Sequence, residues 1–102
     1  MGEQILNLSK QNETEIVPID SEHYSVMNLL RNKDPRDVKK VYLTASGGPF
    51  FNKSIQEVAN KSLEEALKHP TWEMGKKITI DSATLINKCF EIIEAHYLFD
   101  IP

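Results

Sequence analysis

Three acidic side chains in this sequence could bind a divalent cation. Asp20 and Glu22 stand two residues apart in a turn that precedes a predicted helix, and Glu91 lies in the last predicted helix. Carboxylate oxygens are the hard donors that Mg²⁺ and Mn²⁺ prefer. The same turn is typical of helix capping, which is the more common use of this spacing. His23 could also be a ligand, but a packed or hydrogen-bonded ring is the more common case.

Two polar clusters could bind a phosphate group. The stretch 46–48, Ser-Gly-Gly, offers a hydroxyl and backbone amides, which suit an anion cradle and equally a tight turn. Ser82, with Asn87 and Lys88 about a turn later, could hold a phosphate through hydroxyl, amide and ammonium groups. The alternative for this second cluster is a helix cap beside a solvated lysine.

The loop at 69–76 could cover a ligand. His69 could donate to an anion, or it could simply end a helix together with Pro70. Trp72 and Met74 lie near the flexible Gly75 and could form an apolar lid. An ordinary loop or an interaction surface is the alternative.

Short apolar stretches precede each group of candidate residues. The stretches 14–19, 38–44 and 77–80 have the character of strands, and each is followed by a turn rich in Ser, Gly or Asp. Ligands bind at the carboxyl ends of strands in α/β folds, so these turns are expected to line one edge of a sheet. The sequence therefore predicts an α/β (α+β) fold, a small sheet flanked by helices.

Several helices are predicted between and after these strands. Ser54 and Ser62 each precede a Glu by three residues, the signature of a capping box. Apolar residues recur at helical spacing over 83–99, and Asp81 and Ser82 are expected to cap this helix. The three polar residues Asn87, Lys88 and Glu91 interrupt its apolar face.

Composition excludes several classes of function. The 102 residues carry a net charge of −3 with no basic stripe, which argues against nucleic acid as a partner. No apolar run approaches the roughly 20 residues of a membrane span, and no dinucleotide fingerprint is present. The single cysteine, Cys89, rules out an internal disulfide and is expected to pack on the apolar side of the last helix.

Four long strings resemble the central, catalytic region of the 1-deoxy-D-xylulose 5-phosphate reductoisomerase family. They are PIDSEH (18–23), LTASGGPF (43–50), ALKHPTWEMGKKITIDSATLINK (66–88) and FEIIEAHYLF (90–99). The resemblance covers essentially the whole chain. It implies an NADPH- and Mg²⁺- or Mn²⁺-dependent enzyme that converts this sugar phosphate to 2-C-methyl-D-erythritol 4-phosphate in non-mevalonate isoprenoid biosynthesis.

The resemblance also implies roles for individual residues. It implies metal binding by Asp20, Glu22 and Glu91, and catalytic roles for Glu22, Lys88 and His69. It implies contacts to NADPH by Met74 and Gly75. The implied substrate contacts are Ser21, Ser46, His69, Trp72, Met74, Ser82, Asn87, Lys88 and Glu91.

The resemblance further implies a place for this chain in a larger multidomain enzyme. Residues 1–19 are expected to be the tail end of an absent NADPH-binding domain, and 20–102 a catalytic domain truncated at its C-terminal side. Such a fragment is expected to be inactive alone, in a bacterial cytoplasm or a plastid-type organelle, and a homodimer is possible. The alternative is a non-catalytic binding or assembly module. Cys89 departs from the small residue, usually glycine, expected there.

Overall fold

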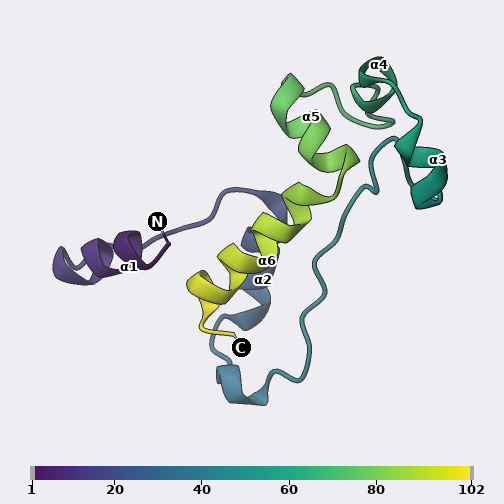
Figure 1. Cartoon of the computed structure of the whole chain (residues 1–102). Coiled ribbons are helices and arrows are strands. Elements are labelled where there is room, and N and C mark those ends of the chain that lie inside the picture. The colour runs from purple at the N-terminus through teal and green to yellow at the C-terminus, as the bar shows by residue number, and fades with distance from the viewer. Residues whose placement is uncertain (1, 102) are drawn as a thin grey trace. The chain divides into compact units, whose positions relative to one another are not determined.

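The computed structural model describes residues 2–101, with the backbone alone at Pro35, and within this range every regular element is a helix (Figure 1). The predicted small sheet, and with it the α/β class, is therefore wrong. The helices are α1 (Gly2–Gln11), α2 (Ser21–Leu30), the 3₁₀ turn η1 (Pro35–Asp37), α3 (Ile55–Ala59), α4 (Leu63–Ala66), α5 (Lys76–Ala83) and α6 (Ile86–Phe99).

The three predicted strands fail for two different reasons. The stretches 14–19 and 38–44 form no regular element, and no described segment pairs with them. A strand is stable only when its N–H and C=O groups bond to a neighbouring strand, which local sequence cannot supply. The stretch 77–80 lies inside α5, whose buried residues Thr79 and Ala83 are four apart. An alternation this short does not distinguish a strand from a helix.

The chain divides into two compact units. Unit 1 comprises Met1–Leu43 and Glu91–Pro102, and unit 2 comprises Thr44–Phe90. The division does not fall at the domain boundary predicted between residues 19 and 20, which stays a prediction. The candidate metal residues belong to unit 1, and most of the candidate substrate residues belong to unit 2.

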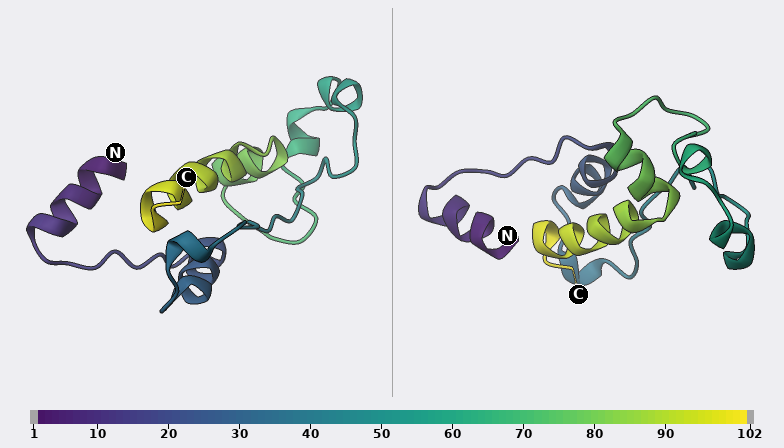
Figure 2. Two further views of the ribbon diagram at one scale, coloured as in Figure 1. Left: turned by 90° about the horizontal axis from the view of Figure 1, so that it is seen from below. Right: turned by 45° about the horizontal axis from the view of Figure 1, so that its top comes forward.

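Unit 1 joins α1, α2 and the C-terminal turns of α6. Its buried apolar side chains are Val26 from α2 and Ala95 from α6, and these two helices lie side by side (Figures 1 and 2). Gly2 of α1 faces the Tyr97 ring of α6 so closely that an added Cβ would lie 2.9 Å from it. Helices α1 and α2 thus both contact α6.

Unit 2 contains short helices held by local caps. Ser54 and Ser62 cap α3 and α4, each in a complete capping box with Glu57 and Glu65 respectively, as predicted. α4 packs against α5. Since α4 has only four residues, its caps and this contact must stabilise it in place of a long run of internal hydrogen bonds.

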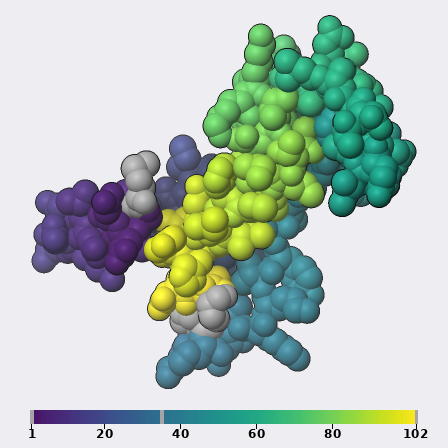
Figure 3. All heavy atoms as spheres, viewed as in Figure 1, coloured from purple at the N-terminus to yellow at the C-terminus, as the bar shows by residue number. Residues whose placement is uncertain are grey.

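The region around α6 differs from the prediction in three ways. Asp81 and Ser82 lie in the last turn of α5 and do not cap α6, and Leu85, with a φ of 60°, separates the two helices. Within unit 1, α6 buries Glu91 and Ala95 and exposes Ile92 and Ile93 at 58% and 55%. Its C-terminal turns are uncovered on the face shown in Figure 3. Cys89 is exposed, so its predicted packing is also wrong.

No helix within residues 2–101 is long and apolar enough to cross a membrane.

Candidate functional site

The acidic turn of unit 1 is organised by the N-terminus of α2. Asp20 is the N-cap residue, and its Oδ1 accepts a hydrogen bond from the backbone N–H of His23 at 2.7 Å. Its Oδ2 lies 3.0 Å from Nδ1 of the same histidine ring. Burial opposes ionisation of Asp20, but these bonds outweigh it and lower the pKa of the carboxyl group. The predicted capping role of Asp20 is therefore confirmed. The predicted metal site would use the same carboxylate.

His23 links this cap to α6. Its ring is only 2% exposed, and its Nε2 lies 2.9 Å from the backbone carbonyl of Glu91. The Asp20 carboxylate and the Glu91 carbonyl can only accept, so both ring nitrogens must donate, and the ring is an imidazolium. Burial opposes this charge, but the Glu91 carbonyl and Asp20 outweigh it and raise the pKa of His23. The carboxylate of Glu94 adds attraction, with its Oε2 3.9 Å from Nδ1.

The remaining carboxylates of the predicted cation site lie on the same two helices. Glu22, in the first turn of α2, accepts a 2.8 Å hydrogen bond from the Ser21 hydroxyl, and Glu91 is buried in α6. The donor set suits a hard divalent cation. However, no cluster of three or more such side chains placed to hold a metal ion occurs within residues 2–101. The metal assignment of these three residues therefore stays a prediction.

In unit 2, a histidine and a serine from separate loops meet directly. His69 Nε2 lies 2.9 Å from the Ser46 hydroxyl, and the backbone N–H groups of Thr71 and Trp72 donate to His69 Nδ1 at 3.2 and 2.9 Å. Because Nδ1 accepts two hydrogen bonds, it carries no proton, and Nε2 is the donor to Ser46. His69 is therefore a neutral ring in one defined tautomer.

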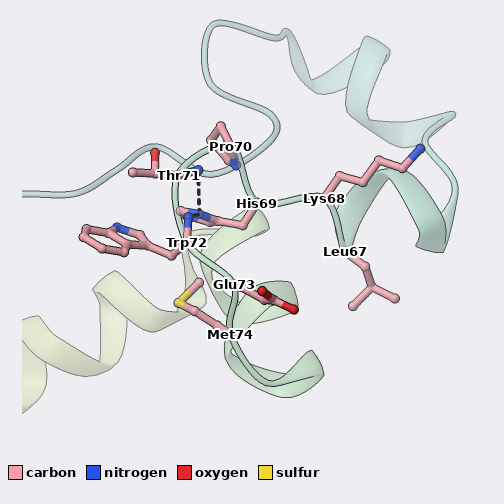
Figure 4. Close-up of a pocket in the computed structure, with 8 residues that line it drawn as sticks. All are labelled: Leu67, Lys68, His69, Pro70, Thr71, Trp72, Glu73 and Met74. Carbon is pink, nitrogen blue, oxygen red and sulfur yellow. Dashed lines mark hydrogen bonds between the residues drawn. The ribbon is translucent and has the colours of Figure 1, made fainter.

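This histidine shapes an open pocket of about 400 Å³ (Figure 4). The pocket is lined by the whole stretch 67–74, so the predicted lid residues Trp72 and Met74 lie in one wall with His69. Trp72 is 63% exposed, as expected for a side chain that could cover a ligand. Gly75 follows directly as the N-cap residue of α5, with open space beside its Cα.

Two of the other predicted phosphate residues, Ser82 and Lys88, lie beside the loop 44–48. The Lys88 ammonium donates to the backbone carbonyl of Thr44. Gly48 lies against α5, since an added Cβ would be 3.0 Å from the Ser82 carbonyl oxygen. Ser46 Oγ also accepts a 3.4 Å hydrogen bond from the Gly48 N–H. The loop therefore brings Ser46 and His69 together and lies beside the backbone of Ser82 and the side chain of Lys88, and Asn87 is the chain neighbour of Lys88.

The two glycines of this loop adopt an unusual backbone conformation. Gly47 and Gly48 have φ values of 82° and 63°, the left-handed region that other residues rarely adopt. Two groups were not foreseen: the Thr44 carbonyl that accepts from Lys88, and Glu94 beside His23. Every residue has a backbone carbonyl, so the sequence cannot indicate which one accepts a hydrogen bond from Lys88. Glu94 could have been found from its position one helical turn after Glu91.

Comparison with known proteins identifies the family. Residues 16–99 match the family described as 1-deoxy-D-xylulose 5-phosphate reductoisomerase C-terminal domain. Proteins named 1-deoxy-D-xylulose 5-phosphate reductoisomerase are similar to this chain in Caldanaerobacter subterraneus subsp. tengcongensis (54% identity over 101 residues) and Clostridium kluyveri (50% over 101 residues). These two matches cover 99% of this chain and 26% of each relative.

A third relative of the same name, from Aquifex aeolicus, is 57% identical over 93 residues, which cover 91% of this chain and 24% of that protein. The chain thus spans about a quarter of the length of the curated relatives it matches. The match over residues 16–99 includes every candidate residue in both units. The chain therefore belongs to the 1-deoxy-D-xylulose 5-phosphate reductoisomerase C-terminal domain family.

Proposed function

We propose that this chain supplies the metal- and substrate-binding groups of an NADPH-dependent reductoisomerase that acts on 1-deoxy-D-xylulose 5-phosphate in non-mevalonate isoprenoid biosynthesis. The product would be 2-C-methyl-D-erythritol 4-phosphate. The observation that carries this proposal is the match of residues 16–99 to the family, together with relatives at 50–57% identity that bear the enzyme's name.

The geometry of unit 2 supports a role in holding the phosphate. Ser46 Oγ accepts from His69 and from the Gly48 N–H, so its own proton is directed elsewhere and can donate to a phosphate oxygen. Lys88 brings a positive charge to the same loop. Ser82 and Asn87 are proposed as further contacts, and Trp72 and Met74 as an apolar cover that excludes water. Binding energy from the phosphate would position the reacting carbons, which lie elsewhere in the substrate.

In unit 1, Asp20, Glu22 and Glu91 are proposed to hold Mg²⁺ or Mn²⁺, with Ser21 close to a substrate hydroxyl. A divalent cation bound there would stabilise negative charge on substrate oxygens. NADPH is proposed to bind mainly through residues outside this chain, with Met74 and Gly75 in contact with it. The chain alone is accordingly expected to be inactive. A bacterial cytoplasm or plastid-type organelle, and a homodimer, are part of the same proposal.

Titration with Mn²⁺ tests the metal half of the proposal. Electron paramagnetic resonance of the free ion should show saturable binding by the 102-residue chain, weakened at least tenfold in Asp20→Asn and in Glu91→Gln. Asp37→Asn is the matched control, since Asp37 is an exposed carboxylate of the same unit and should bind like the wild type. Equal binding by all four proteins would instead favour a non-catalytic binding or assembly module.

An activity assay tests the expectation that the chain is inactive alone. NADPH oxidation is followed with 1-deoxy-D-xylulose 5-phosphate and Mn²⁺. No turnover is expected from the chain by itself. Robust turnover would contradict that expectation while supporting the assignment of the reaction.

A further inference from the structure

We propose that His23 is a positioning residue that orients the Asp20 carboxylate and ties the N-terminus of α2 to the backbone of α6 at Glu91, and so holds together the two segments that carry the proposed cation ligands. This inference rests on the proposed metal function. It assigns a role to a side chain that is not itself proposed as a ligand.

The first observation is the burial of His23. Its side chain is only 2% exposed, and it is the largest fully buried side chain among residues 2–101. A buried polar ring is stable only when its nitrogens are bonded. Its neighbours along the two helices, Val26 and Ala95, are also buried and lie about one turn from His23 and Glu91 respectively. His23 therefore belongs to the small interior of unit 1.

The second observation is the direction of its bonds. Nδ1 reaches Asp20 Oδ2 at 3.0 Å, and Nε2 reaches the Glu91 carbonyl at 2.9 Å. The two bonds leave opposite sides of one rigid ring, so they fix the distance between the α2 cap and α6. The backbone N–H of His23 holds the other oxygen of Asp20 at 2.7 Å. Both oxygens of this carboxylate are thus oriented by a single residue.

The third observation is that Asp20 stays accessible. Its side chain is 45% exposed even though both oxygens accept a hydrogen bond. A carboxylate oxygen has a second lone-pair site, so a cation can share the group without breaking these bonds. Metal-binding carboxylates are commonly held in this way by hydrogen bonds from residues behind them, whose loss costs about 10–100-fold in metal affinity.

The test uses the 102-residue chain and two substitutions that each keep one bond. In His23→Asn the side-chain amide can take the place of Nδ1 and bond Asp20, and in His23→Gln it can take the place of Nε2 and bond the Glu91 carbonyl. His96→Gln is the control, because His96 is an exposed ring on α6, bonded to the Ile101 carbonyl. Mn²⁺ affinity is measured by electron paramagnetic resonance, and helix content by circular dichroism.

Both His23 variants should bind Mn²⁺ about 10–100-fold more weakly than the wild type while retaining their helix content, and His96→Gln should change the affinity less than twofold. Folded His23 variants with wild-type affinity would overturn the positioning role. If a variant loses its helix content, the inference is tested on the His23 ring of the wild-type chain instead. Nuclear magnetic resonance of the metal-free chain should show contacts from the His23 ring to α6 at Glu91 and to Asp20.

The absence of these ring contacts would overturn the inference whatever the metal result. If the contacts are present in a wild-type chain that binds no Mn²⁺, the proposed metal function is refuted, and with it the purpose assigned to His23. The two failures are therefore separate.

Discussion

Unit 1 and unit 2 each place a histidine among candidate site residues, and the two rings are bonded in opposite ways. His23 donates from both nitrogens to oxygen acceptors and is therefore a buried cation. His69 accepts two backbone N–H bonds at Nδ1 and is therefore neutral. The neighbours of a ring, more than its burial, select its protonation state. In unit 1 a charged ring orients the Asp20 carboxylate, and in unit 2 a neutral ring orients the backbone of Thr71 and Trp72.

Removing the ring of unit 1 should have the largest effect. His23→Ala leaves the Asp20 carboxylate and the Glu91 carbonyl without their donor and creates a cavity, so we expect a loss of about 2–4 kcal/mol in the unfolding free energy of unit 1. Circular dichroism during urea unfolding measures it. Trp72 is the only tryptophan and lies in unit 2, so its fluorescence transition should not move. If the Trp72 transition shifts by the same amount, the two units unfold together and cannot be treated as separate.

A glycine of unit 2 should give the next largest effect. Gly48→Ala places a Cβ at a φ of 63° and 3.0 Å from the Ser82 carbonyl oxygen, which should destabilise unit 2 by about 1–3 kcal/mol. Trp72 fluorescence during urea unfolding reports the change. Gly75→Ala is the control, because nothing lies within 4 Å of its added Cβ and its φ of −59° is ordinary. Equal effects of the two substitutions would contradict the close approach at Gly48.

The neutral ring of unit 2 should act locally. His69→Phe removes the acceptor for the Thr71 and Trp72 amides, at a cost of about 1–2 kcal/mol, and should increase the mobility of Trp72 measured by fluorescence anisotropy. His69→Asn offers a side-chain oxygen to the same amides and should largely preserve the anisotropy. If Asn and Phe behave alike, the acceptor role of Nδ1 is disproved.

The smallest effect concerns an exposed capping box. The hydrogen bond from Lys61 to Glu65, with the Ser62 backbone N–H, lowers the pKa of Glu65 to about 2. Because the folded pKa is depressed, the stabilisation is complete above the ordinary value near 4.3 and is lost as the pH falls toward 2. Nuclear magnetic resonance titration of Glu65 should show this, and Lys61→Met should move the midpoint upward. An unchanged midpoint would exclude Lys61 as the main cause.

The sequence was informative wherever a feature depends on neighbours within a few residues. The caps at Asp20, Ser54 and Ser62 follow from side chains that bond the chain three residues on. The left-handed backbone at 47–48 follows from the two glycines. Such features need no knowledge of the tertiary structure.

Features that depend on distant partners were missed or wrongly predicted. A strand needs a second strand, and neither 14–19 nor 38–44 has one among the described residues. The sequence predicts Glu91 as an interruption of an apolar face, but Glu91 is buried in α6, and its carbonyl accepts a hydrogen bond from His23, 68 residues earlier. The apolar periodicity over 83–99 predicts a helix correctly, but it does not predict which face of that helix packs against the rest of the protein.

The bond between His23 and the Glu91 carbonyl also has a consequence for the order of folding. It joins residues 68 apart, whereas the Ser46–His69 bond of unit 2 joins residues only 23 apart. Closing the longer loop costs about 1 kcal/mol more in chain entropy. At a synthesis rate of roughly 5–20 residues per second, Glu91 is made about 3–14 s after His23. The Ser46–His69 bond of unit 2 can therefore form while Glu91, the acceptor for His23, has yet to be made.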